Sequence, residues 1–115
     1  MIFKLCWQDI NGITYVLGKL YKKENNYHFD IDEEGLKKAT HNGCFGIGEF
    51  NLLDNSYVNE ELFDFFKRRI PKKDSSNIEE IMREFNIEQY DEMELLKRTK
   101  GKLNSDRYYL EEILE

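Results

Sequence analysis

The chain has 115 residues, of which 40% are hydrophobic and 14% are aromatic, and this fits one domain with a single core. Phenylalanines and tyrosines recur throughout the chain, which excludes a disordered protein. The formal net charge of −6 disfavours binding to nucleic acid over the whole surface and binding to an anionic membrane, because both rely on a basic protein surface. Any nucleic acid must therefore be bound by a local basic patch.

The first residues and the cysteines favour a cytoplasmic protein that needs no metal or cofactor. Met1 leads directly into a short alternating segment instead of a signal peptide, and no apolar stretch approaches the length of a membrane span. Cys6 and Cys44 form neither a CxxC motif nor a Cys/His cluster, so neither a zinc site nor a redox motif is predicted. We expect two buried free thiols, with one disulfide between them as the alternative.

The first third of the chain has the pattern of β-strands. Large side chains alternate with smaller or polar ones over residues 3–7, which predicts a strand with one apolar face. Asn11-Gly12 predicts a tight hairpin turn, and a second strand is expected over residues 13–20. A polar turn at residues 24–26 precedes a third alternating run over residues 27–31. These segments together predict an antiparallel meander.

The segment that follows the meander predicts a short helix and then a glycine-rich stretch. The helix is expected over residues 33–42, ended by Asn42-Gly43 in a left-handed conformation. Residues 44–50 fit either an edge strand or an ordered loop. A phosphate-binding loop is disfavoured here, because no GK[ST] motif follows. We expect exposed apolar side chains of this stretch to contact a partner, and the candidates are Phe45, Ile47 and Phe50.

The second half of the chain has the pattern of helices. Asn59 is the expected N-cap of a helix that Pro71 ends. Leu62, Phe65 and Phe66 share one face of this helix by their spacing and are expected in the core. Phe63 falls to the side of that face, so it is a further candidate for contact with a partner.

Two more helices and a final strand are expected towards the C-terminus. Ser76 and Glu79 have the spacing of a capping box, and Asp91 and Glu94 repeat it. Residues 107–114 are expected to return as a last strand and then to fray or turn into a short helix. Strands followed by helices predict an α+β fold, in which an antiparallel sheet built from the N-terminal meander has three to four helices packed on one face.

Catalytic residues are not apparent in the sequence. His28 and His41 are the only histidines, and neither has a recognisable catalytic partner. Pairs of glutamates fall at helix starts or on polar faces, where negative charge stabilises the helix. We therefore expect a protein that is not an enzyme.

The one dense basic run extends from Lys67 to Lys73 and contains five cationic residues. Cations at the end of a helix stabilise it through the helix dipole, which is the structural interpretation. The functional interpretation is a local patch for an acidic partner or for a nucleic-acid backbone, with Arg68 and Arg69 as the candidate contact residues.

Three groups of residues, taken in order along the chain, carry a resemblance to a known family. They are Val16-Leu17-Gly18-Lys19-Leu20 after a strand with tryptophan, Glu61-Leu62-Phe63-Asp64-Phe65-Phe66 with Arg69-Ile70-Pro71, and Glu92-Met93-Glu94-Leu95-Leu96 with Gly101 and Asp106. In their order and spacing they resemble the N-terminal domain of the HipA family, from Phe3 to about Leu110. Each motif alone is moderately specific.

The resemblance implies an interaction module over residues 1–115. In the HipA family this module precedes a serine/threonine-kinase core that acts as a bacterial toxin in toxin–antitoxin systems, and in split versions it is a separate protein that binds and restrains the kinase. An antitoxin or accessory subunit of a HipA-type kinase is therefore implied. Similar modules also precede HIRAN domains, so the alternative is a nucleic-acid-associated adaptor of a HIRAN-type DNA-processing protein. The catalytic motifs of the kinase are missing from the chain.

Overall fold

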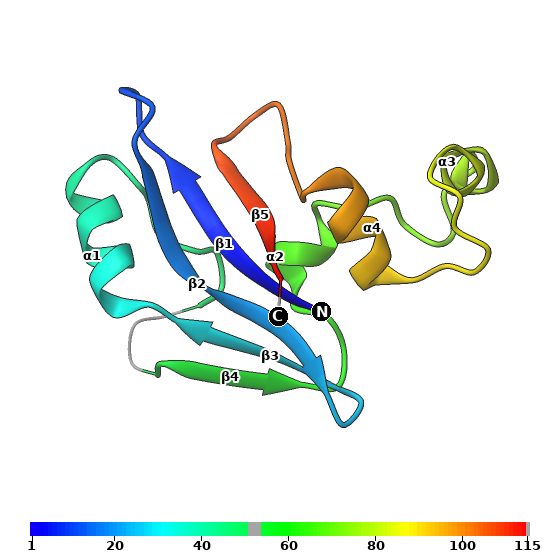
Figure 1. The fold of residues 1–115 in the computed structure, drawn as a ribbon, viewed down its shortest axis with the longest axis horizontal. Coiled ribbons are helices and arrows are strands. Elements are labelled where there is room, and N and C mark those ends of the chain that lie inside the picture. Colours follow the sequence, from blue (N-terminus) through cyan, green and yellow to red (C-terminus); the bar gives the residue numbers. More distant parts are fainter. Residues whose placement is uncertain (51–53, 115) are drawn as a thin grey trace.

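The computed structural model describes residues 1–50 and 54–114, which form a five-stranded antiparallel sheet with helices in the connections (Figure 1). The strand order across the sheet is β4-β3-β2-β1-β5. The predicted α+β fold is thus confirmed. The strands are β1 (Ile2–Gln8), β2 (Thr14–Lys23), β3 (Asn26–Ile31), β4 (Ser56–Asn59) and β5 (Tyr108–Ile113).

The first three strands form the predicted meander, and each hairpin has a local cause. In the β1–β2 turn, Asp9 Oδ1 accepts hydrogen bonds from the backbone amides of Asn11 and Ile13, both at 2.9 Å, while Gly12 takes a φ of +83°. In the β2–β3 turn, Glu24 and Asn25 both have positive φ, as a tight two-residue hairpin turn requires. Strand β2 continues to Lys23, further than the sequence predicts.

Four helices are present among the described residues, and three of them contribute to the core. Buried side chains come from α1, α2 and α4, whereas α3 has none that is fully buried. Figure 1 shows α3 at the far end of the molecule from α1, beyond α4. The helices are α1 (Glu33–His41), α2 (Asp64–Lys67), α3 (Ile78–Glu84) and α4 (Glu92–Thr99).

Helix α1 lies against the backbone of β2, and a glycine makes this approach possible. A Cβ atom at Gly35 would lie only 1.7 Å from the carbonyl oxygen of Val16. The helix starts at this point because the Asp32 amide donates to the carbonyl of Leu17 at 2.9 Å, and the Asp32 side chain caps the Gly35 amide at 2.9 Å. α1 has the bounds that the sequence predicts to within one residue.

The helix expected from Asn59 begins later and is shorter than predicted. Asn59 is the last residue of β4, an edge strand in which it pairs with Tyr27 of β3. Phe63 is extended, with φ −62° and ψ 143°, and α2 starts only at Asp64. Pairing with β3 thus places Asn59 in a strand instead of at a helix N-cap, because tertiary contacts override local propensity.

The C-terminal third confirms some predictions and corrects one. Asp91 caps α4, since its Oδ1 accepts from the amides of Met93 and Glu94 at 3.0 and 3.2 Å. The proposed capping box at Ser76 is wrong, because the N-cap of α3 is Asn77, which forms no capping bond with its side chain. The final strand is present as β5 and pairs with β1.

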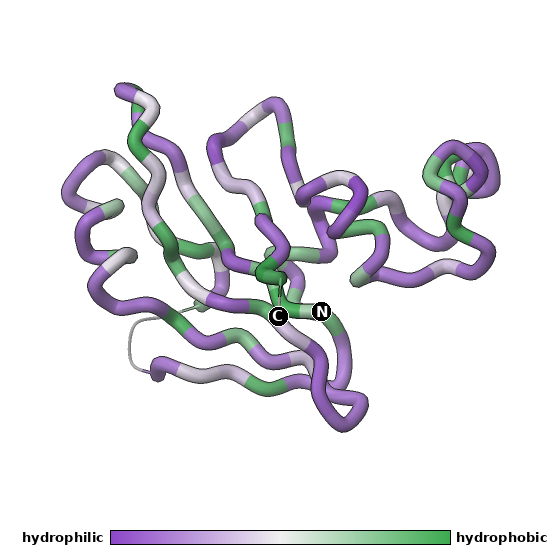
Figure 2. Tube along the Cα trace, viewed as in Figure 1, coloured by the Kyte–Doolittle hydropathy of each residue, from purple (hydrophilic) through white to green (hydrophobic). Residues whose placement is uncertain are grey.

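The core lies between the sheet and the helices α1, α2 and α4. Figure 2 shows hydrophobic residues along the central strands and a hydrophilic β2–β3 turn. Close packing extends to Gly18, where an added Cβ would lie 2.7 Å from the ring of Phe29. In the described residues no helix is both long and apolar enough to cross a bilayer. The fully buried large side chains are Phe3, Leu5, Leu17, Leu20, Phe29, Leu62, Phe66, Leu95, Leu96 and Leu110.

Candidate binding groove

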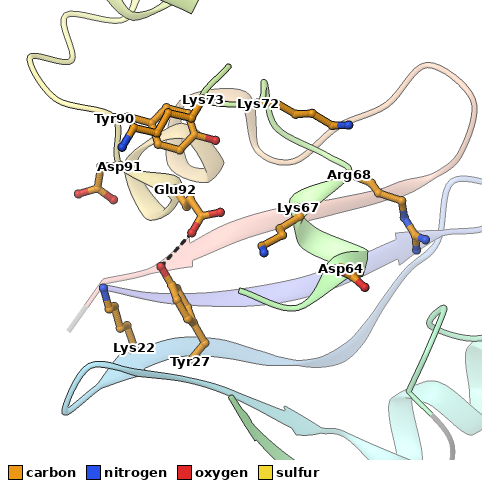
Figure 3. Close-up of a pocket in the computed structure, with 10 residues that line it drawn as sticks. All are labelled: Lys22, Tyr27, Asp64, Lys67, Arg68, Lys72, Lys73, Tyr90, Asp91 and Glu92. Atoms are coloured by element: carbon orange, nitrogen blue, oxygen red, sulfur yellow. Dashed lines mark hydrogen bonds between the residues drawn. The ribbon is translucent and has the colours of Figure 1, made fainter. Parts of the chain in front are cut away.

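A groove of about 890 Å³ lies between the β2–β3 hairpin, helix α2 with the segment after it, and the start of α4. Figure 3 shows its side chains coming from these three parts of the chain. We call it the basic groove. Its lining residues are Lys22, Tyr27, Asp64, Lys67, Arg68, Lys72, Lys73, Tyr90, Asp91 and Glu92.

The basic run of the sequence forms much of this groove. Four of its five cations line the groove from α2 and from the segment after Pro71, and Lys22 of β2 adds a fifth cation from the other side. Three carboxylates also line it. The groove therefore carries an excess of two positive charges, in a chain whose formal net charge is −6.

Two of the three carboxylates already have partners within the fold. Asp91 caps α4 through two backbone amides. Glu92 Oε1 accepts a hydrogen bond from the Tyr27 hydroxyl at 3.3 Å (Figure 3). Their negative charge is thus held by hydrogen-bond donors of the protein itself.

The cations have fewer partners. Lys67 lies 3.6 Å from Glu61 and Arg68 lies 4.0 Å from Glu49, and these are largely exposed pairs of the kind that contribute little to stability. Within residues 1–50 and 54–114, Lys22, Lys72 and Lys73 form no ion pair. Three ammonium groups of one groove therefore remain available for an anionic ligand.

Two tyrosines complete the walls of the groove. Burial raises the pKa of Tyr27 to about 12, and the neighbouring Glu92 carboxylate adds to the increase. The Lys22 ammonium lies 5.1 Å from the centroid of the Tyr27 ring. Tyr90 donates a hydrogen bond to the carbonyl of Pro71 at 2.7 Å, and burial raises its pKa as well. At neutral pH both phenols are therefore neutral donors. The hydrogen bond of Tyr90 also connects the segment before α3 to the segment after it.

Arg69 is not in the groove, so the expectation that it contacts a partner from the surface is wrong. Its side chain is buried, and its Nη2 forms an ion pair with Asp106 Oδ2 at 2.5 Å. Its Nη1 donates to the carbonyl of Gly101 at 2.8 Å. Asp106 is 37 residues away in sequence, and sequence reasoning noted it only through the family resemblance. Arg69 joins α2 to the α4–β5 connection.

The expected exposure of three aromatic or aliphatic candidates is also wrong. Ile47, Phe50 and Phe63 are buried in the core. The Phe50 ring lies 5.2 Å from that of Phe63 and 4.6 Å from that of Phe29. Helical spacing could not reveal this, because Phe63 lies before the helix and is extended.

Two of the candidate side chains are exposed as expected. Phe45 is fully exposed on the stretch 44–50, which is an ordered loop closed by a bridge between Ile47 and Phe50. Arg68 is exposed at the edge of the groove. Their contact with a partner stays a prediction.

The histidines and cysteines do not form a catalytic or metal site together. His28 stacks on Tyr21 with 5.0 Å between ring centroids, and His41 is exposed in the last turn of α1. Cys6 and Cys44 are buried free thiols, as expected, and burial raises the pKa of Cys6. The described part of the chain contains no group of three or more His, Cys, Asp or Glu side chains that could hold a metal ion.

Comparison of the chain with protein-family models, with curated proteins and with solved structures yields no match in any of the three. The function is therefore inferred from the groove and from the resemblance described above.

Proposed function

We propose that the chain is a non-enzymatic interaction module that binds an acidic segment of a protein partner in the basic groove. The observation that carries the proposal is the presence of Lys22, Lys72 and Lys73 in one groove without ion pairs in the described structure. Two of the three carboxylates beside them are bound by donors of the fold. An acidic segment supplies the missing negative charge.

The charges of the groove favour specificity and fast association over high affinity. Exposed ion pairs contribute roughly 0.2–1 kcal/mol each, so several contacts are needed for a stable complex. The net charge of −6 repels acidic molecules in general, whereas the local positive potential of the groove attracts a matching segment. The two phenols add neutral hydrogen-bonding groups to the walls.

The partner in this proposal is the core of a HipA-type serine/threonine kinase. The family resemblance supports this choice, because split HipA-type systems use such a module as antitoxin or accessory subunit. By holding a mobile acidic segment of the kinase, the module restrains the enzyme without chemistry of its own.

A nucleic-acid backbone is the alternative occupant. A chain with an acidic composition needs a local basic patch to bind nucleic acid, and the groove provides one. The carboxylates of Asp64, Asp91 and Glu92 line the same groove and oppose a phosphodiester chain, which is charged at every unit, more than a protein segment, in which acidic side chains can alternate with neutral ones. The mixture of signs therefore favours a protein segment.

Calorimetric titration of the chain with any HipA-type kinase core encoded beside its gene tests the proposal. We expect the double substitution Lys72→Glu/Lys73→Glu to weaken binding by about tenfold or more, because the ligand then meets like charges. The matched control is Lys37→Glu/Lys38→Glu, which reverses two exposed charges of α1 and leaves the affinity unchanged.

Two results would overturn the proposal. Absence of binding to the kinase core removes the partner, and unchanged binding by Lys72→Glu/Lys73→Glu removes the groove. Tight binding to a DNA duplex that falls steeply with salt, and is lost on neutralising Arg68, would favour the adaptor of a HIRAN-type protein instead.

A further inference from the structure

Strand β4 forms one edge of the sheet, and its outer side has no neighbouring strand among the described residues. It comes first in the strand order β4-β3-β2-β1-β5, and Figure 1 shows it as the outermost strand, with β3 on one side only. The edge of a sheet exposes backbone amides and carbonyls, and these groups can pair with a further extended chain. What this edge can bind depends on which groups of β4 point outwards.

The outward backbone groups of β4 are those of Ser56 and Val58. The amide of Ile31 donates to the carbonyl of Asn55 at 2.7 Å, so these two residues form a hydrogen-bonded pair of the antiparallel ladder. Because such pairs alternate with pairs that lack these bonds, the backbone of Tyr57 also bonds to β3, whereas the backbones of Ser56 and Val58 do not. Their amides and carbonyls point away from the sheet, and within residues 1–50 and 54–114 they form no backbone hydrogen bond.

The opposite edge of the sheet, at β5, is covered in part by the protein itself. The outward amide of Leu110 donates to the carbonyl of Lys100 at 2.7 Å, and that of Tyr108 donates to Asp106 Oδ1 at 3.2 Å. An ion pair of 3.8 Å also joins α4 to this strand. In the described part of the chain, β4 is therefore the edge that is open to a further strand.

The sequence of β4 lacks the features that keep an open edge from pairing. Proteins protect such edges with charged residues, with proline or with a bulge. The residues of β4 are Ser-Tyr-Val-Asn, and the strand keeps one register with β3 along its whole length. Tyrosine and valine favour the extended conformation, and the Val58 side chain is 59% exposed on the face of the sheet opposite to that of Tyr57. The edge is thus suited to pairing with an uncharged, extended segment.

Acidic residues flank this edge at both ends and select the occupant. Asp54 and Glu60 are exposed and form no ion pair in the part of the chain that the structure describes. A second copy would use both outward residues by pairing Ser56 with Val58 of that copy, and Asp54 would then face its Glu60. Like charges directly opposite each other destabilise a ladder. Lysine or arginine at the ends of an incoming strand would meet the same carboxylates favourably, so the charges favour a different chain.

We infer that β4 is a docking site for an extended segment of a partner protein, in which uncharged β-forming residues lie between basic ones. The segment adds a strand to the sheet through main-chain hydrogen bonds with Ser56 and Val58. Its basic side chains pair with Asp54 and Glu60. This site prefers the opposite charge to the basic groove, so the two sites recognise different segments.

Amide hydrogen exchange of the labelled full chain, followed by NMR, tests the inference with the synthetic peptide acetyl-Lys-Thr-Val-Thr-Val-Lys-amide in large excess. We expect exchange to slow at Ser56 and Val58, whose amides point outwards, and to change little at Tyr57, whose amide already bonds to β3. The matched control is the same peptide with N-methyl groups on its four central amides. It keeps the charge and loses the hydrogen-bond donors, so it should give no protection.

Two variants separate the backbone contacts from the charges. Val58→Pro removes an outward amide and leaves the bonds between β4 and β3 in place, because an edge strand tolerates a proline whose nitrogen faces solvent. We expect it to abolish the protection of Ser56 by the peptide, whereas Val58→Thr retains the protection. Asp54→Lys/Glu60→Lys changes exposed side chains only and should weaken binding of the peptide by about tenfold.

Several outcomes would overturn the inference. Protection confined to other parts of the chain, or equal protection by the N-methylated peptide, would exclude strand addition at β4. Unchanged binding by Asp54→Lys/Glu60→Lys would exclude the charge selection, and this variant decides even where the proline variant unfolds. Protection of Ser56 and Val58 that rises with protein concentration, without peptide, would assign the edge to a second copy. The proposed function is untouched by these results, because it rests on the basic groove.

Discussion

The Arg69 guanidinium packs against the rings of both Phe65 and Tyr108 while it forms an ion pair with Asp106. The distances from the guanidinium carbon to the two ring centroids are 4.7 and 5.1 Å. This arrangement joins α2, the α4–β5 connection and β5 through one side chain. It also leaves Arg69 Nε buried without a hydrogen-bond partner among the described residues, so the charge depends on Asp106 for compensation.

We expect Asp106→Ala to lower the free energy of unfolding by about 3 kcal/mol, because it leaves a buried cation without its carboxylate. The value lies at the lower end for such pairs, since Asp106 is partly exposed. Urea denaturation measures it. Arg68→Ala, at the exposed neighbour of Arg69, serves as the control and should change stability by less than about 0.5 kcal/mol. A loss as small for Asp106→Ala would show that the ion pair does not hold these elements together.

We expect Gly35→Ala to destabilise the protein by about 3 kcal/mol or more, because the added methyl group would meet the carbonyl of Val16 and force α1 away from β2. Thermal unfolding followed by circular dichroism measures the effect. The control is Lys37→Ala, an exposed position on the same helix, which should be neutral or slightly stabilising. A stability for Gly35→Ala like that of the control would contradict the close approach of α1.

We expect Asp91→Ala to lower the stability by about 1 kcal/mol, since two backbone amides at the start of α4 lose their acceptor. Ser76→Ala should have no measurable effect, because Ser76 does not cap α3. Denaturant unfolding of the two variants side by side makes the comparison. Equal losses would mean that Ser76 has the capping role that its spacing with Glu79 predicts.

The stability should fall at alkaline pH in a way that depends on Tyr27. Burial, with a smaller contribution from Glu92, raises the pKa of Tyr27 from 10.0 to about 12. Because the folded-state pKa is the higher one, the stabilisation is fully present below pH 10 and is lost as the pH rises towards 12. Unfolding free energies measured across this range should fall less steeply for Tyr27→Phe than for the unchanged protein.

Glu92→Gln is the matched variant for this pH dependence. It removes the charge of the carboxylate and leaves the burial of the phenol, which is the largest cause of the raised pKa, so part of the alkaline loss should remain. If Tyr27→Phe and the unchanged protein lost stability in parallel, the phenol of Tyr27 would not be buried as described.

The sequence predicts the meander well, because its signals are local. Alternation over residues 3–7 and turn residues such as Gly12 act within a few positions of one another, and Asp91 caps its helix by the same kind of local bond. Strand β4 is not predictable in this way. Its pairing with β3 is a tertiary contact, and it places Asn59, the expected helix N-cap, at the end of an edge strand.

The candidate site is predicted only in part, because some of its residues come together through tertiary contacts that no local sequence pattern reveals. A dense run of cations marks Lys67, Arg68, Lys72 and Lys73 in the sequence, but Lys22 joins them only through the fold. The same run includes Arg69, whose burial depends on a carboxylate 37 residues away. Charge density along the chain therefore identifies the patch, while the direction of each side chain requires the tertiary structure.

Hydrogen exchange measured with and without the HipA-type kinase core tests the central proposal most directly, because it locates the contact on the unmodified protein. We predict slower exchange over residues 64–73 and 90–92, the two segments that contribute side chains to the basic groove, when the kinase core is added in excess. Exchange in α1, on the other side of the molecule, should stay the same. Unchanged exchange throughout the groove, with the kinase core present at saturating concentration, would contradict the proposal.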